Sequence, residues 1–284
     1  MALPPEGLDL SHPDTITQEE IDAFHAAYER TGKGRLDSFE FWIEFRPDVL
    51  KRHKARTPHY FGEETREHPL PLQLAALHQY TIESFDDGIS YEIRNSRSGG
   101  ARLTDVVDTL SIAWLSSGHA GMYAMSRAAV AYLRSYPEPD IPPRFPPSWG
   151  FDPAPLECGM DYSNDDTSSA ELGKLLVWYE RTVGFVPRNV SFLAKHRPGL
   201  LKTYRSRYEH AIRDSLPVQM MPFLLLNHAV VRGWGESMRE NFLLGRALGM
   251  TDEQLQDAVF LGVLFAGASV LDAVDAAISD LIGT

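Results

Sequence analysis

The sequence predicts an all-α protein made of two similar helical bundles. Apolar residues recur with helical periodicity through most of the chain, and the alternating pattern of β-strands is missing almost everywhere. A second observation is a residue pattern that occurs twice, 149 residues apart, which is typical of an internal duplication. The recurring residues are Gly100, Asp105, Asp108 and Gly118 in the first stretch, and Gly249, Gln254, Asp257 and Gly267 in the second.

The first bundle is predicted to span residues 15–136, after a Pro-rich segment, residues 1–14, that we expect to be disordered. Thr17 and Glu20 form a capping-box pattern that begins a helix ending near Glu29. Further helical periodicity covers residues 45–53, 70–85, 89–96 and 106–133, with Gly99 and Gly100 as the break between the last two. The pattern of residues 45–53 recurs at 196–204, an interval of 151 residues.

Residues 137–168 are rich in proline, which a helix interior does not accommodate, so they are predicted to form an extended connector. The second bundle then spans residues 169–284. Its predicted helices lie near residues 172–183, 198–215, 217–232, 236–248 and 252–281. Because the two bundles share one pattern, we expect a pseudo-two-fold relation between them.

Composition excludes several classes of function. The formal net charge of −12 argues against a nucleic-acid partner, which requires clustered basic residues. The single cysteine, Cys158, rules out internal disulfides and two-thiol chemistry within one chain. No apolar run is long enough to span a membrane, and the N-terminus lacks the pattern of a signal peptide. We therefore expect a cytoplasmic protein without a membrane partner.

The second of the two matching stretches resembles the carboxymuconolactone decarboxylase and alkylhydroperoxidase D-like (AhpD-like) family. The residues that carry the resemblance are Gly249, Thr251, Gln254, Asp257, Phe265, Gly267 and Ser269. Gln254 stands for an acid, Phe265 for a tyrosine and Ser269 for a proline, and the first copy has Arg102 in place of the threonine. The resemblance implies helical bundles that assemble into symmetric oligomers. We accordingly expect a homo-oligomer, a dimer or trimer of two-unit chains.

The redox chemistry of this family does not carry over. Peroxidase-type members have a Cys-x-x-Cys-x-x-x-His motif before the glycine, and their thiolate attacks peroxide. The corresponding positions hold Phe85, Gly88 and Glu92 in the first copy and Trp234, Ser237 and Asn241 in the second. No thiol stands at these positions, and a serine hydroxyl cannot form a sulfenic acid, so peroxide reduction by this route is excluded. The histidine of decarboxylase-type members is also replaced, by Glu92 and by Asn241.

Glu92 is the principal catalytic candidate, because a carboxyl group in an apolar pocket has its pKa raised towards neutral pH. His78 and His119 are predicted to orient the substrate or to stabilise developing charge. Tyr91, Glu83 and His228 are candidate substrate-binding residues. These residues lack the spacing of helical metal-ligand pairs, so we expect no metal and no cofactor.

Each candidate also has a purely structural interpretation. Glu92 could be an exposed acid paired with Arg94 or Arg97, and a histidine in an apolar helix is usually a hydrogen-bonded core residue. Glu236 and Glu240, four residues apart, share a helix face. Such a pair of acids could divide acid and base roles, but the expected arrangement is a solvated face near Arg232 and Arg239.

Two functions from different classes are consistent with this pattern. The first is a cofactor-independent lyase, similar to a decarboxylase, that acts by acid/base proton transfer on a small organic acid, lactone or carbonyl compound. The alternative is a non-catalytic binding or assembly protein in which duplication preserved the packing and lost both family sites.

Overall fold

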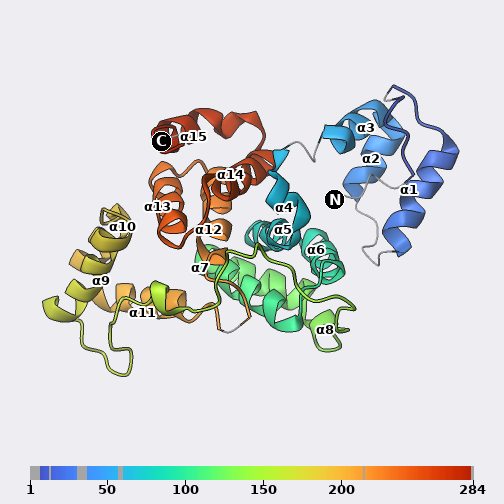
Figure 1. Cartoon of the computed structure of the whole chain (residues 1–284). Coiled ribbons are helices and arrows are strands. Elements are labelled where there is room, and N and C mark those ends of the chain that lie inside the picture. Colours follow the sequence, from blue (N-terminus) through green and yellow to red (C-terminus); the bar gives the residue numbers. More distant parts are fainter. Residues whose placement is uncertain (1–6, 13, 31–36, 57–59, 214, 283–284) are drawn as a thin grey trace. The chain divides into compact units, whose positions relative to one another are not determined.

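The computed structural model describes the chain apart from residues 1–6, 13, 31–36, 57–59, 214 and 283–284 (Figure 1). Throughout the described part, the regular secondary structure is helical, so the prediction of an all-α protein is confirmed. Among the described helices, none combines the length and the apolar character needed to cross a membrane.

The chain divides into two compact units. Unit 1 comprises residues 1–106 and 119–146, and unit 2 comprises residues 107–118 and 147–284. These boundaries differ from the predicted ones, because residues 107–118 of a first-half helix belong to unit 2 and the Pro-rich stretch is shared between the units.

The first half of the chain carries eight α-helices within its described residues. They are α1 (Gln18–Arg30), α2 (Asp37–Phe45), α3 (Pro47–Arg56), α4 (Glu63–Glu67), α5 (Leu70–Ile82), α6 (Asp86–Ser98), α7 (Leu103–Ala128) and α8 (Val130–Leu133). The predicted capping box before α1 is present, since the Thr17 backbone N–H donates to Glu20 and the Glu20 N–H donates to Thr17 Oγ1. A small core of Phe24, Ile43 and Leu50 joins α1, α2 and α3, and α5 packs against α6.

Helix α7 is bent at Gly118, where φ is 56° and ψ is −137°. Such a conformation is strained for residues with a Cβ atom, so glycine permits the bend. The helix belongs to unit 2 between residues 107 and 118 and to unit 1 on either side of them.

Within its described residues, the second half carries seven α-helices and the short 3₁₀ turns η2 (Ala154–Leu156) and η3 (Ala268–Val270). The α-helices are α9 (Ser169–Thr182), α10 (Arg188–His196), α11 (Pro198–Glu209), α12 (Met220–Val231), α13 (Gly235–Ala247), α14 (Asp252–Ala266) and α15 (Leu271–Ile278). Helix α12 packs against both α13 and α14, as Figure 1 shows. Two predicted helices are wrong in extent. The one predicted over 198–215 ends at Glu209, and the one predicted over 252–281 is interrupted at Gly267, where φ is 74°.

The helices of the second half follow those of the first at two nearly equal intervals. Helices α9, α10 and α11 begin 151 residues after α1, α2 and α3, which is also the interval between the 45–53 and 196–204 segments. Helices α13 and α14 begin 149 residues after α6 and α7, which is also the interval between Gly100 and Gly249. Positive backbone φ angles recur at this shorter interval as well. The pairs are Ser84 and Gly233, Gly100 and Gly249, and Gly118 and Gly267.

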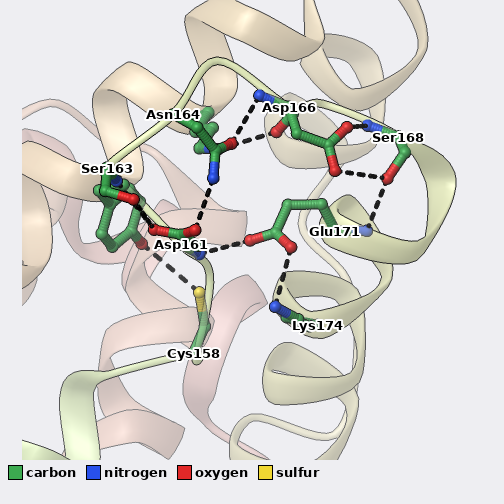
Figure 2. Close-up of polar contacts among 10 residues, drawn as sticks. Cys158, Asp161, Ser163, Asn164, Asp166, Ser168, Glu171 and Lys174 are labelled. Atoms are coloured by element: carbon green, nitrogen blue, oxygen red, sulfur yellow. Dashed lines mark hydrogen bonds and ion pairs between the residues drawn. The ribbon is translucent and has the colours of Figure 1, made fainter.

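A network of side chains holds the loop before α9 (Figure 2). Asp161 Oδ1 accepts hydrogen bonds from the Ser163 backbone N–H, at 2.9 Å, and from its hydroxyl, at 2.7 Å. The Asp161 backbone N–H in turn donates to Glu171 in the first turn of α9. Lys202 of α11 donates to the backbone oxygen of Asp166 at 2.8 Å. The loop therefore fixes the start of α9 relative to α11.

Equivalent contacts hold the segment before α1. Asp9 Oδ1 accepts from the Ser11 backbone N–H, at 2.9 Å, and from its hydroxyl, at 2.6 Å. The Asp9 backbone N–H donates to Glu20 at 2.7 Å, and Lys51 of α3 donates to the backbone oxygen of His12 at 3.1 Å. Part of the segment expected to be disordered is thus hydrogen-bonded to α1 and α3, while residues 1–6 and 13 lie outside the described residues.

Candidate functional site

A cavity of about 390 Å³ lies within unit 2. Its volume falls in the range of small-molecule sites, about 300–1,000 Å³. Helices α9 to α13 and residues 115–116 of α7 form its walls. The apolar and aromatic lining consists of Leu115, Leu175, Tyr179, Val190, Leu193, Leu201, Tyr204, Tyr208, Leu225, Ala229 and Trp234. The polar lining consists of Ser116, Asn189, Arg205, His228, Ser237, Glu240 and Asn241.

Helical spacing explains why these residues meet. On α11, Tyr204 and Arg205 lie three or four residues from both Leu201 and Tyr208, so these four side chains occupy one face of the helix. The same spacing places Ser237, Glu240 and Asn241 on one face of α13. Each helix thus presents a single face to the cavity.

Arg205 is the buried cation of the cavity wall, with only 3% of its surface exposed. Its Nε donates to Glu209 Oε1 at 2.7 Å, and its Nη2 donates to the backbone oxygen of Leu156. The guanidinium carbon lies 4.0 Å from the centre of the Trp178 ring and 4.7 Å from that of Tyr208, so cation–π contacts hold the group from its faces.

The third nitrogen of this guanidinium, Nη1, is buried and has no hydrogen-bond acceptor among the described residues. A buried N–H of a charged group without a partner is costly, by about 1–3 kcal/mol or more. Arg205 lines the cavity, so a ligand oxygen that reached this buried nitrogen would be stabilised.

Glu240 is the acid of the cavity. Burial raises its pKa to about 7, against the opposing effects of a hydrogen bond from Tyr179 and of the positive charge of Arg205. A carboxyl group with this pKa both binds and releases protons at neutral pH, as a general acid or base must. The expectation that Glu236 and Glu240 form a solvated face is therefore wrong for Glu240, because that side chain lines the cavity beside residues of α9 and α11.

His228 and Trp234 also line the cavity. Their rings are in edge-to-face contact, with centroids 5.3 Å apart. Burial, together with the charge of Arg232, lowers the pKa of His228 to about 4. The imidazole is consequently neutral at physiological pH and is suited to hydrogen bonding rather than to charge pairing.

Of the six residues predicted from the sequence, His228 lines this cavity. His78, Tyr91 and Glu92 are buried in unit 1, where Glu92 Oε2 accepts a hydrogen bond from Asn95 at 2.8 Å. Glu83 and His119 are exposed. The predicted set is thus spread over buried and exposed positions and over both units.

Sequence reasoning missed Arg205, Tyr179 and the cavity position of Glu240. Two signals in the sequence pointed to them. Arg205 lies among aromatic residues at helical spacing, and Tyr179 follows Tyr28 at the interval that also relates the 45–53 and 196–204 segments.

No cluster of three or more His, Cys, Asp or Glu residues in the described part of the chain has an arrangement that would hold a metal ion. No family model, no curated protein and no solved structure matches the chain.

Proposed function

We propose that the protein is a lyase-type enzyme that acts by proton transfer on a small organic acid, lactone or carbonyl compound, with its active site in unit 2. The observation that carries the proposal is Glu240, whose pKa of about 7 combines with a position in a cavity wall beside Arg205. Perturbed acids in cavities are typical of catalytic sites.

We further propose that the chain arose by duplication of one helical unit similar to those of the AhpD-like family. The two nearly equal helix intervals, the paired positive φ angles and the matching loops before α1 and α9 support this origin. The resemblance assigns the family's reactive positions in the second copy to Trp234, Ser237 and Asn241, and all three line the cavity. In this proposal, the cavity corresponds to the family's reactive site, with a different set of side chains.

The proposed chemistry follows from the state of each group. In a decarboxylation, the bond between the α-carbon and the carboxylate of the substrate breaks, carbon dioxide leaves, and the electron pair of that bond stays on the α-carbon, next to a carbonyl or lactone group. The protonated Glu240 carboxyl then transfers its proton to that carbon, and solvent returns a proton to Glu240. Tyr179, hydrogen-bonded to Glu240, holds the carboxyl group in place, while Arg205 offers Nη1 to a substrate oxygen.

The test is a Glu240→Gln variant, with Glu236→Gln as the matched control on the same helix. Small acids, lactones and ketones would be incubated with each protein in D₂O, and deuterium incorporation and product formation would be followed by NMR. We expect Glu240→Gln to lose about 100-fold or more of the activity, the usual contribution of a general acid, and Glu236→Gln to retain it. Equal activity of the Glu240→Gln variant and the wild type would support the non-catalytic alternative.

A further inference from the structure

We propose that Arg205 binds a carboxylate through Nη1, so that the ligand of the cavity is an organic acid anion rather than a neutral lactone or ketone. This inference rests on the proposed function only in taking the cavity of unit 2 as the substrate site. Of the three proposed substrate classes, which are organic acids, lactones and carbonyl compounds, it selects the organic acids.

The position of the guanidinium supports this assignment. Nε and Nη2 are occupied by Glu209 and by the Leu156 backbone oxygen, and the Trp178 ring covers a face at 4.0 Å. The plane of the group is therefore fixed before any ligand binds. Arg205 lines the cavity and Nη1 lacks an acceptor among the described residues, so a ligand oxygen that reached this buried nitrogen would complete the hydrogen bonds of the guanidinium.

The charge balance favours an anion over a neutral carbonyl group. Glu209 Oε1 accepts hydrogen bonds from Arg205 Nε, at 2.7 Å, and from the Cys158 backbone N–H, at 2.9 Å. Arg205 thus contacts the Glu209 carboxylate through Nε, and the N–H groups of Nη1 are left for a ligand. A neutral carbonyl group would gain only the hydrogen bond from the guanidinium, whereas a carboxylate would gain that bond and the Coulomb attraction between the two charges.

The other charged groups at the cavity set the condition for binding. Glu240 of α13 faces Arg205 of α11, and His228 of α12 is held neutral by burial and by Arg232. Two carboxylates in one cavity repel each other. The anion should therefore bind most tightly when Glu240 is protonated, while side chains such as Leu175, Leu193 and Leu225 enclose its apolar body.

Calorimetry with matched ligand pairs tests the inference. The probes are phenylacetate, 4-phenylbutanoate and hexanoate, each compared with its primary amide, which has nearly the same shape and no charge. At pH 6, we expect the wild type to bind at least one acid about tenfold or more tightly than its amide. Equal affinities within every pair, or no binding of any acid, would overturn the inference without the need for a variant.

Variants of Arg205 test whether this residue causes the preference for the acid over its amide. Arg205→Met should abolish the preference for the acid, and Arg205→Lys, which keeps the charge, should retain part of it. Arg246→Met is the matched control, because Arg246 also pairs with an acid, Asp252, donates to a backbone oxygen and lies 5.1 Å from an aromatic ring, that of Phe242. A preference that survives in Arg205→Met would overturn the inference.

The Glu240→Gln variant separates this inference from the proposed function. If it keeps the acid preference and loses activity, both proposals stand. If it keeps both the preference and the activity, carboxylate binding by Arg205 stands and the catalytic role of Glu240 fails.

Discussion

In unit 1, Tyr28 of α1 stacks on Tyr91 of α6 with ring centroids 6.2 Å apart, whereas in unit 2 Tyr179 of α9 is hydrogen-bonded to Glu240 of α13. These positions correspond in the two halves of the chain. Tyr179 follows Tyr28 by 151 residues, as α9 follows α1, and Glu240 follows Tyr91 by 149 residues, as α13 follows α6. The pairing of positions is shared, and the chemistry differs. One pair joins two phenols, and the other joins a phenol and a carboxyl group.

A third pair of positions shows the same contrast. Lys54 Nζ donates to the Tyr28 hydroxyl at 2.8 Å and lies 4.3 Å from the centre of the Phe39 ring. Arg205, its counterpart on α11, occupies a similar aromatic setting. Burial raises the pKa of Tyr28 to about 12, so this phenol keeps its proton at neutral pH, while the pKa of Glu240 is about 7. Of these corresponding side chains, Glu240 of unit 2 is therefore the one that binds and releases protons at neutral pH.

The most demanding test of this contrast compares acids in the two units. Glu240→Gln should lower turnover by about 100-fold or more, whereas Glu92→Gln, which changes a buried acid of unit 1, should leave turnover within about twofold of the wild type. Steady-state kinetics on the substrate found by the NMR screen would measure both. A large loss in Glu92→Gln would instead place the reaction in unit 1, where the sequence alone suggested it.

The next test compares the contributions to stability of Lys51 and Lys202, which occupy corresponding positions on α3 and α11. Lys51 is 1% exposed and forms an ion pair with Glu20 at 2.5 Å. Lys202 instead donates to two uncharged acceptors, the side-chain oxygen of Asn164 and the backbone oxygen of Asp166. Removing one partner of a buried ion pair is costly, so Lys51→Met should lower the free energy of unfolding by about 3 kcal/mol. Lys202→Met should lower it by about 1–2 kcal/mol. Chemical denaturation would measure both, and equal losses would contradict the difference between the units.

The Lys51 pair also has a pH dependence whose sign is fixed. Burial alone would raise the pKa of Glu20, but hydrogen bonds from Lys51 and from the Thr17 and Asp9 backbones outweigh it and lower this pKa to about 2. The stabilisation from Glu20 is therefore complete above its unfolded pKa, about 4.5, and is lost as the pH falls towards 2. The loss of stability caused by Lys51→Met should shrink over the same range.

A smaller effect is expected when the hydrogen bond to Glu240 is removed. That bond lowers the pKa of Glu240, so Tyr179→Phe should raise this pKa above about 7. If Glu240 acts as an acid, activity falls as the pH rises through its pKa, and the variant should remain active to higher pH. Tyr208→Phe, in the same cavity wall, is the control and should leave the inflection of the pH–rate profile unchanged. A shift to lower pH in Tyr179→Phe would contradict the proposed role.

The helices were predictable from the sequence because their signals are local. Helical periodicity and glycines such as Gly249 and Gly267 indicated most of the elements and the interval at which they recur. The cavity was not predictable in this way, since Tyr179, Arg205 and Glu240 come from three different helices and meet only through tertiary packing. Taken alone, Glu240 four residues after Glu236 has the pattern of a surface pair, and no local feature of α13 shows that it lies beside α9 and α11.

The smallest expected effect concerns one pair of turns. Ser84 has φ of 56°, and Gly233, its counterpart in the second half, has φ of 65°. A side chain in this left-handed region costs about 1 kcal/mol, so Ser84→Gly should raise the melting temperature slightly and Gly233→Ser should lower it. If the two turns descend from one ancestral turn, the two changes should be similar in size and opposite in sign, as measured by thermal denaturation. Two changes of the same sign would show that the surroundings of these turns, rather than their shared backbone geometry, determine which residue each one tolerates.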